Sequence, residues 1–159
     1  MSTPWADAMS ATCTALAARF APGTITTPSG GLAMRPASGQ MPKQATALPF
    51  TYVEVTTGQI IPNSGQWEHQ WSIDTVTAFA KRPGDPVRVD KQRQIWLPTL
   101  LAATEGQLKL GIGAQTGWEL AKALPQNWRW DEVVIGAEDF DAIRISWFID
   151  IFKTVSLVP

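Results

Sequence analysis

The sequence predicts an α+β domain, in which an antiparallel or mixed β-sheet carries two main helices packed on one face, in the order α-β-β-α-β-β(-β). Two segments, 2–20 and 87–106, repeat apolar residues at three- and four-residue spacing, which is typical of helices. The segments 48–57, 67–80 and 142–158 alternate in residue type with period two, as strands do. A chain of 159 residues fits one core, so we expect 1–159 to form a single domain.

The first helix has sequence signals at both ends. Ser2 or Thr3 can cap it, and Pro4 suits the first helical position. The sequence Ala-Pro-Gly at 21–23 ends it. Its apolar stripe consists of Trp5, Met9, Cys13, Leu16 and Phe20. Because the single cysteine lies on this stripe, we expect it to be a core residue and not a reactive thiol.

Residues 23–47 are rich in Gly, Pro, Ser and Thr and show no sustained periodicity. A segment of this length without regular structure is unusual inside a compact domain. It is either an ordinary loop or an extended arm that becomes ordered against a neighbouring subunit, and the sequence leaves both open.

The stretch WEHQWSIDTVTAF at 67–79 reads as one long strand that follows the strand 48–57 and a turn at 58–65. Period two places the aromatic and β-branched residues on one side, and His69 therefore points away from Glu68 and Asp74. At about 3.3 Å per residue the strand would be roughly 40 Å long. We expect it to extend past a small sheet and to find its missing contacts on a second copy of the chain.

The second half of the chain supplies the remaining elements. The helix 87–106 contains Pro98, which predicts a kink or a break near Trp96. Two strands are expected at 117–124 and 125–136, although the Ala, Leu, Lys and Glu residues of 117–124 would also suit a short helix, and an acidic turn is expected at 138–141. The closing strand has one apolar face and one mixed face. The apolar face consists of Ile143, Ile145, Trp147, Ile149 and Ile151.

The residue types needed for most catalytic sites are scarce. His69 and Cys13 are the only histidine and cysteine, so a zinc site lacks ligands, and no Gly-x-Ser-x-Gly motif accompanies a Ser-His-Asp arrangement. Gly111 and Gly113 do not belong to a dinucleotide fingerprint. The acidic residues at 138–141 fit a solvated hairpin better than a glycosidase pair. We therefore predict no enzymatic activity, no cofactor and no metal site.

The charge content points toward a covered surface. The chain has 13 basic and 14 acidic residues, a formal net charge of -1, which gives no electrostatic reason to expect nucleic-acid or membrane binding. Such a weakly charged surface is poorly protected against self-association. No apolar segment reaches the roughly 18 residues that a membrane span needs, and no secretory signal is visible, so we expect a soluble protein made in a cytoplasm without a membrane partner.

The chain from about residue 48 to 157 resembles the tail terminator proteins of long-tailed, siphovirus-like bacteriophages. The resemblance rests on the order of LPFTYVEV, WEHQWSIDTVTAFA, RQIWLPTLLAA, LKLGIG and VVIGAEDFDAIRISWFIDIF. The segment 23–47 is longer than this family leads one to expect, so another neck or head-completion (head-tail joining) protein stays open as an alternative. A Trp-rich carbohydrate- or ligand-binding β module and a small acid-dependent hydrolase are further alternatives.

The resemblance implies a non-enzymatic virion protein of the phage tail or neck, assembled in the host cytoplasm. Such a protein forms a homo-oligomeric, hexameric ring that caps the tail tube of major tail protein and meets the head-side connector or stopper protein. DNA would pass through the lumen without sequence-specific contacts. Large aromatic residues are enriched in interfaces, and our expected subunit-interface residues are Trp67, Trp71, Trp128 and Trp130.

Overall fold

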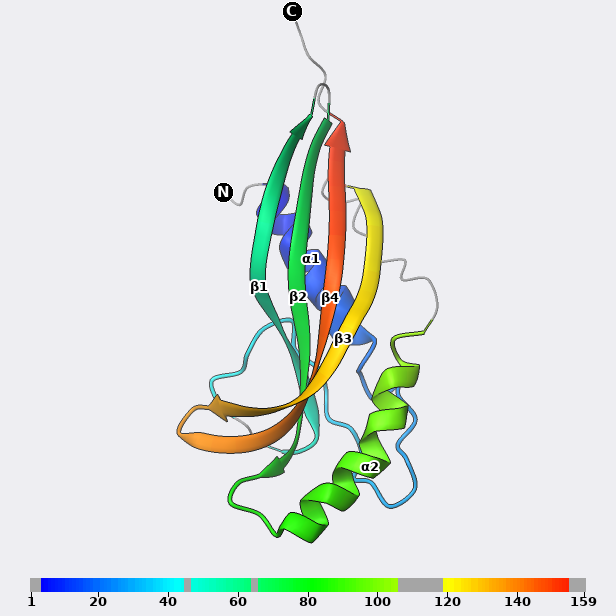
Figure 1. The fold of residues 1–159 in the computed structure, drawn as a ribbon, viewed down its shortest axis with the longest axis vertical. Helices are drawn as coiled ribbons and strands as arrows, with labels where there is room; N and C mark the ends of the chain where they lie inside the picture. Colours follow the sequence, from blue (N-terminus) through cyan, green and yellow to red (C-terminus); the bar gives the residue numbers. More distant parts are fainter. Residues whose placement is uncertain (1–3, 45–46, 64–65, 106–118, 155–159) are drawn as a thin grey trace, which may run out of the picture.

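The computed structural model describes residues 4–44, 47–63, 66–105 and 119–154, and the side chains of these except at 4–7, 63, 66–67, 119–122 and 153–154. Two helices and four strands follow one another in the predicted order α-β-β-α-β-β, which confirms the α+β class. Their bounds are α1 Pro4–Ala18, β1 Phe50–Asn63, β2 Gln66–Lys81, α2 Pro86–Ala102, β3 Glu119–Ile135 and β4 Glu138–Thr154. Figure 1 shows an elongated sheet with α1 behind its upper half and α2 beside its lower half.

The four strands form one antiparallel sheet in the order β1-β2-β4-β3. The long strand at 67–80 is confirmed as β2, but it is a central strand: it pairs with β1 from residue 66 to 78 and with β4 from 66 to 81. The expectation that its backbone depends on a second copy is therefore wrong. Neighbours within the chain are equally long, because β1 continues through the predicted turn to Asn63.

The expected pair of strands at 117–124 and 125–136 is a single strand. β3 runs through Pro125, and the register against β4 shifts between Leu120 and Lys122 and again between Pro125 and Asn127. Proline is tolerated at a sheet edge, where its missing N–H leaves no ladder bond unmade, and each shift absorbs one extra residue. Pro125 therefore does not end the strand.

The hairpin between β3 and β4 turns at Gly136, two residues before the predicted acidic turn. Gly136 has φ 66°, a left-handed conformation that glycine adopts without steric cost, and Ile135 pairs with Glu138. The acidic residues 138–141 thus begin β4. The expectation of an acidic turn is wrong because backbone conformation, not charge, fixes where the chain reverses.

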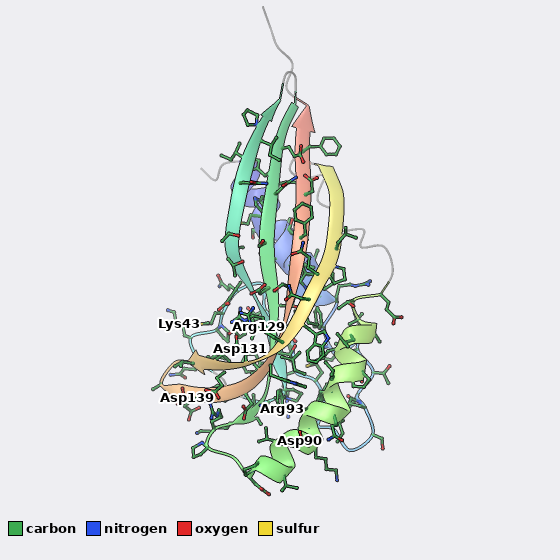
Figure 2. The ribbon with its side chains drawn as sticks, viewed as in Figure 1. Lys43, Asp90, Arg93, Arg129, Asp131 and Asp139 are labelled. Atoms are coloured by element: carbon green, nitrogen blue, oxygen red, sulfur yellow. The ribbon has the colours of Figure 1, made fainter. Side chains whose placement is uncertain are left out.

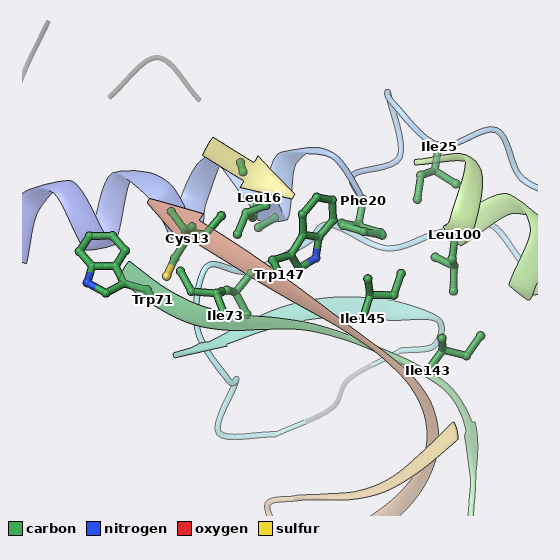
Figure 3. Packing of buried hydrophobic residues seen from close by; sticks show 14 of the residues in the cluster. Cys13, Leu16, Phe20, Ile25, Trp71, Ile73, Leu100, Ile143, Ile145 and Trp147 are labelled. Atoms are coloured by element: carbon green, nitrogen blue, oxygen red, sulfur yellow. The ribbon is translucent and has the colours of Figure 1, made fainter. Parts of the chain in front are cut away.

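The main core lies between the helices and one face of the sheet, called here the helix-covered face (Figure 3). It contains Leu16 and Phe20 from α1, Leu100 from α2, and odd-numbered residues of β2 and β4 such as Ile73 and Trp147. The alternation predicted for both strands is confirmed, since all five apolar residues from Ile143 to Ile151 are 2% exposed or less. Cys13, 7% exposed, also belongs to this core, as expected.

A smaller core lies on the opposite face, at the lower end of the sheet. There β3 and β4 bend away from the long axis (Figure 1) and bring Val133, Ile135 and Phe140 against Phe50 and Tyr52 of β1. The upper half of this opposite face is not covered by either helix. Both faces of the lower sheet are therefore buried, whereas the upper sheet is buried on one.

The Gly/Pro-rich segment folds onto its own protomer. Residues 35–38 follow the outer edge of β1: the Arg35 amide donates to Pro49 O and the Ser38 amide to Thr51 O, both at 2.9 Å. Ile25 and Met34 are buried in the main core. Two residues of the predicted arm, 45 and 46, lie outside the described part. The arm thus shields the lower edge of β1.

The second helix, predicted at 87–106, begins at Pro86 and ends at Ala102, about one turn before the predicted end. Asp85 caps it by accepting a hydrogen bond from the Val87 amide at 3.1 Å, and Pro86 occupies the first turn. The helix continues through Pro98 to Ala102, so the alternative of a break near Trp96 is wrong. Trp96 and Leu100 hold this turn against the core.

Candidate functional site: an ion cluster and two uncharged sheet edges

The strongest polar arrangement in the described residues is centred on Arg144. One carboxylate from each of the other three strands reaches its guanidinium: Glu54 from β1, Asp74 from β2 and Asp131 from β3. The Nη1–Oδ2 distance to Asp74 is 3.0 Å and the Nε–Oδ2 distance to Asp131 is 2.6 Å. Figure 2 places Asp131 where β3 starts to bend. The cluster ties all four strands together at the bend.

Burial alone would lower the pKa of Arg144. The hydrogen bonds that its guanidinium donates to Glu54, Asp131 and Asp74 outweigh this effect and raise the pKa above its usual value. Arg144 is therefore a fixed positive charge. Each of the three carboxylates is paired with the same guanidinium, so the arrangement supports a structural role. Sequence reasoning placed Arg144 on the mixed face of the last strand but missed its three partners, which alternation also assigns to that face.

Tyr52 lies in the same region of the opposite face. Its side chain is fully buried, and its hydroxyl has no hydrogen-bond partner among the described residues. Burial, together with the charge of Glu54, raises the pKa of Tyr52 to about 12. The phenol is therefore neutral at physiological pH and cannot act as a general base there.

His69 and the acidic residues at 138–141 lie in different parts of the sheet, with His69 opposite Ile60 and Ile151 and Glu138 opposite Ile135. Burial lowers the pKa of His69, and its ring lies beside Trp71 at 6.3 Å. Glu138 pairs with Lys81, while Asp141 lies 3.5 Å from Arg93 and 3.9 Å from Arg82. Within the described ranges no three His, Cys, Asp or Glu side chains gather to hold a metal ion. None of the helices described there is long and apolar enough to cross a membrane.

The four tryptophans expected at an interface lie in different environments. Trp71 is 3% exposed and packs in the main core, so its side chain has almost no surface to offer a neighbour and its assignment as an anchor is wrong. Trp130 is half-buried, with Arg93 5.1 Å above its ring. Trp128 is 41% exposed and meets Trp130 edge-on at 5.5 Å. The side chain of Trp67 lies outside the described part. Period two alone cannot separate these cases, because Trp71 and Trp128 both face the helix-covered side.

Each edge strand of the upper sheet contains a stretch without charged residues. We call residues 55–62 of β1 the β1 edge patch and residues 123–128 of β3 the β3 edge patch; neither sequence, VTTGQIIP or ALPQNW, contains an ionisable side chain. Large apolar side chains are nevertheless exposed in both: Val55 and Ile60 in the first, Leu124 and Trp128 in the second. Natural sheets usually protect their edges with charges. In the described chain the only strand partners of the two patches are β2 and β4.

The two edge patches overlap in their level along the sheet. Following the register across the strands, Thr57 is in the row of Ser72, Phe148 and Leu124. The adjacent row runs from Val55 through Ile73 and Trp147 to Pro125, and its side chains point to the helix-covered face. The two patches therefore overlap at the rows of Val55, Thr57 and Gly58; the rest of the β1 edge patch lies above this overlap, and residues 127–128 of the β3 edge patch lie below it.

A groove of about 640 Å³ adjoins the β1 edge patch on the helix-covered face. Val55 forms one wall, Met9 and Cys13 of α1 another, and Ser38 and Gln40 of the Gly/Pro-rich segment the third; no lining residue is charged. A second groove of about 540 Å³, at the start of α2, has Lys81, Asp85 and Arg88 on its rim. The uncharged groove was missed by sequence reasoning because it joins three segments far apart in the chain. Comparison of the sequence with protein-family models and with curated proteins gives no match.

Proposed function

We propose that this protein is a non-enzymatic structural subunit that assembles into a ring, acting as a phage tail terminator that caps the tail tube and joins it to the head-side connector. The observation that carries the ring is the pair of uncharged, partly apolar patches that overlap in level on opposite edges of a single sheet. The role of the ring in a phage tail rests on the resemblance in element order.

The topology supports head-to-tail assembly. In an antiparallel sheet of four strands the two edge strands run in opposite directions, so β1 and β3 are antiparallel. When copies are related by rotation about an axis parallel to the strands, the β1 edge patch of one copy meets an antiparallel β3 edge patch of the next. A contact made at the overlapping rows needs little translation per copy, and a heterologous contact closes into a ring where its rotation divides a full turn.

The charge distribution fits a duct for DNA better than a DNA-binding protein. Binding through phosphates needs clustered Lys and Arg side chains, whereas the formal net charge is -1. Three of the acidic residues surround Arg144, so this buried cation is not available to bind a phosphate. DNA would therefore pass through the lumen with weak, non-specific contacts.

Among the alternatives, another neck or head-completion protein would use the same ring contacts. A Trp-rich sugar-binding module would need several exposed tryptophans on one face. Of the tryptophans whose side chains are described, Trp71, Trp96 and Trp147 are 3% exposed or less and Trp130 is half-buried, so Trp128 alone is exposed. That arrangement gives no aromatic platform.

The direct test is the mass of the purified chain in solution, measured by mass photometry and multi-angle light scattering, with negative-stain images of the particles. A ring of closed stoichiometry is expected, six subunits by analogy with tail terminators. The tail role is tested by adding the chain to polymerising major tail protein from the same genome, where tube growth should stop. A protein that stays monomeric at every concentration and leaves tube length unchanged would contradict the proposal.

A further inference from the structure

Resting on the ring proposed above, we infer that each subunit contact is made by Trp128 of one copy inserting into the uncharged groove between α1, residues 38–40 and β1 of the next copy. The groove of one copy and the indole of the next are thus the two complementary halves of one heterologous contact. The occupant is a second copy of this chain.

Position is the first argument. Trp128 pairs with Ile145 of β4, so its side chain lies on the helix-covered face, and α1 places the groove on that same face. Trp128 shares a row with Val53, which is two residues from the groove residue Val55. The offset along the strands is about 7 Å at 3.3 Å per residue, a distance that the indole and a small tilt can span.

Chemistry is the second argument. The groove has no charged lining residue, so an indole loses little solvation there, and Ser38 and Gln40 can accept a hydrogen bond from its N–H. Its volume of about 640 Å³ falls in the range of about 300–1,000 Å³ typical of pockets that bury a ligand. The groove at the start of α2 has a charged rim and lies at the other end of the protomer, where no edge patch reaches it at equal level.

Pre-organisation is the third argument. Trp128 stands edge-on against Trp130, whose ring is held by Arg93 at 5.1 Å and by Phe79 at 6.3 Å. An exposed aromatic side chain that is already held in place loses little conformational entropy on binding, which is a property of interface hot spots. The aromatic stack thus presents Trp128 as a rigid anchor.

The test blocks each half of the contact separately. Trp128→Ala removes the anchor, and Ser10→Trp fills the groove from the exposed face of α1; either variant should be monomeric by mass photometry at concentrations where the unaltered chain is a ring. Two controls should still form rings: Val134→Ala, which removes an equally exposed apolar side chain from the same face of β3, and Gln92→Trp, which fills the groove at the start of α2. Circular dichroism checks that all four fold.

Mixing the two monomeric variants gives the decisive measurement. Trp128→Ala chains keep an open groove and Ser10→Trp chains keep an anchor, so the mixture should give heterodimers that cannot extend. Rings formed by either variant, or a mixture that stays monomeric, would overturn the inference while leaving the proposed ring intact. An unaltered chain that is itself monomeric would overturn both.

Discussion

The guanidinium of Arg144 on β4 lies 3.0 Å from the carboxylate of Asp74 on β2, and the two side chains are 10% and 6% exposed. This buried pair is completed by Glu54 and Asp131, so one guanidinium contacts three carboxylates drawn from the other strands. The cluster therefore makes the bent, two-faced part of the sheet depend on one residue.

Replacing Arg144 with methionine should lower the free energy of unfolding by about 3–5 kcal/mol, because it leaves buried carboxylates without their cation. Urea denaturation at neutral pH measures this. Arg129→Met is the matched control: Arg129 faces Arg144 across β3 and β4 but is exposed, and its loss should cost less than about 0.5 kcal/mol. Equal costs for the two variants would show that the ion cluster contributes nothing.

Trp147 should be the most sensitive residue of the main core. It is fully buried, and its Nε1 atom donates to Thr75 Oγ1 at 3.0 Å. Trp147→Ala should cost about 3–5 kcal/mol because it leaves a cavity and removes the hydrogen bond that Thr75 Oγ1 accepts. Trp128→Ala serves as the control, since the loss of an exposed ring should barely change the stability of the protomer measured under dissociating conditions.

Tyr52→Phe should keep or raise stability at neutral pH. The variant removes a buried hydroxyl that has no partner in the described structure, and an unsatisfied buried polar group costs about 1–3 kcal/mol. Differential scanning fluorimetry compares it with the unaltered protein. A large loss of stability would mean that the hydroxyl does hold a partner.

Alkaline pH gives a second, independent test at Tyr52. The ordinary pKa of 10.0 is raised to about 12 in the folded chain. The folded state holds this proton more tightly, so the resulting stability is complete below about pH 10 and is lost as pH rises through 12. The difference in stability between the unaltered protein and Tyr52→Phe should therefore change over this interval. Parallel curves would contradict the burial of the phenol.

Cys13 should react slowly with alkylating reagents in the folded chain. Burial raises its pKa from 9.0 to about 11, and a rise of two units lowers the thiolate fraction about 100-fold. Mass spectrometry of samples treated with iodoacetamide at pH 8, with and without denaturant, measures the two rates. Equal rates would show that the thiol is open to solvent.

Removing the cap of α2 by Asp85→Ala should cost about 1 kcal/mol, since the Val87 amide loses its acceptor. Asp90→Ala is the control in the same helix: Asp90 is exposed, and it accepts only a surface hydrogen bond from Gln94 at 2.9 Å. A cost for Asp90 equal to that for Asp85 would argue against capping as the cause.

Much of the candidate interface lay beyond sequence reasoning for a physical reason. Alternation assigned Trp71 and Trp128 to the same kind of face, yet α1 covers Trp71, and the helices leave Trp128 41% exposed. The covering elements are set by long-range packing, which carries no periodic signal. The uncharged groove likewise exists only once three distant segments meet.

Local preference, by contrast, depends on neighbouring residues and was visible in the chain itself. It determined the order of helices and strands, the length of β2 and the apolar face of β4. Tertiary structure decided that β2 is central, that β3 passes through Pro125, and that residues 35–38 cover β1. Strand neighbours are chosen by pairing energies summed over the whole sheet, which no single stretch of sequence contains.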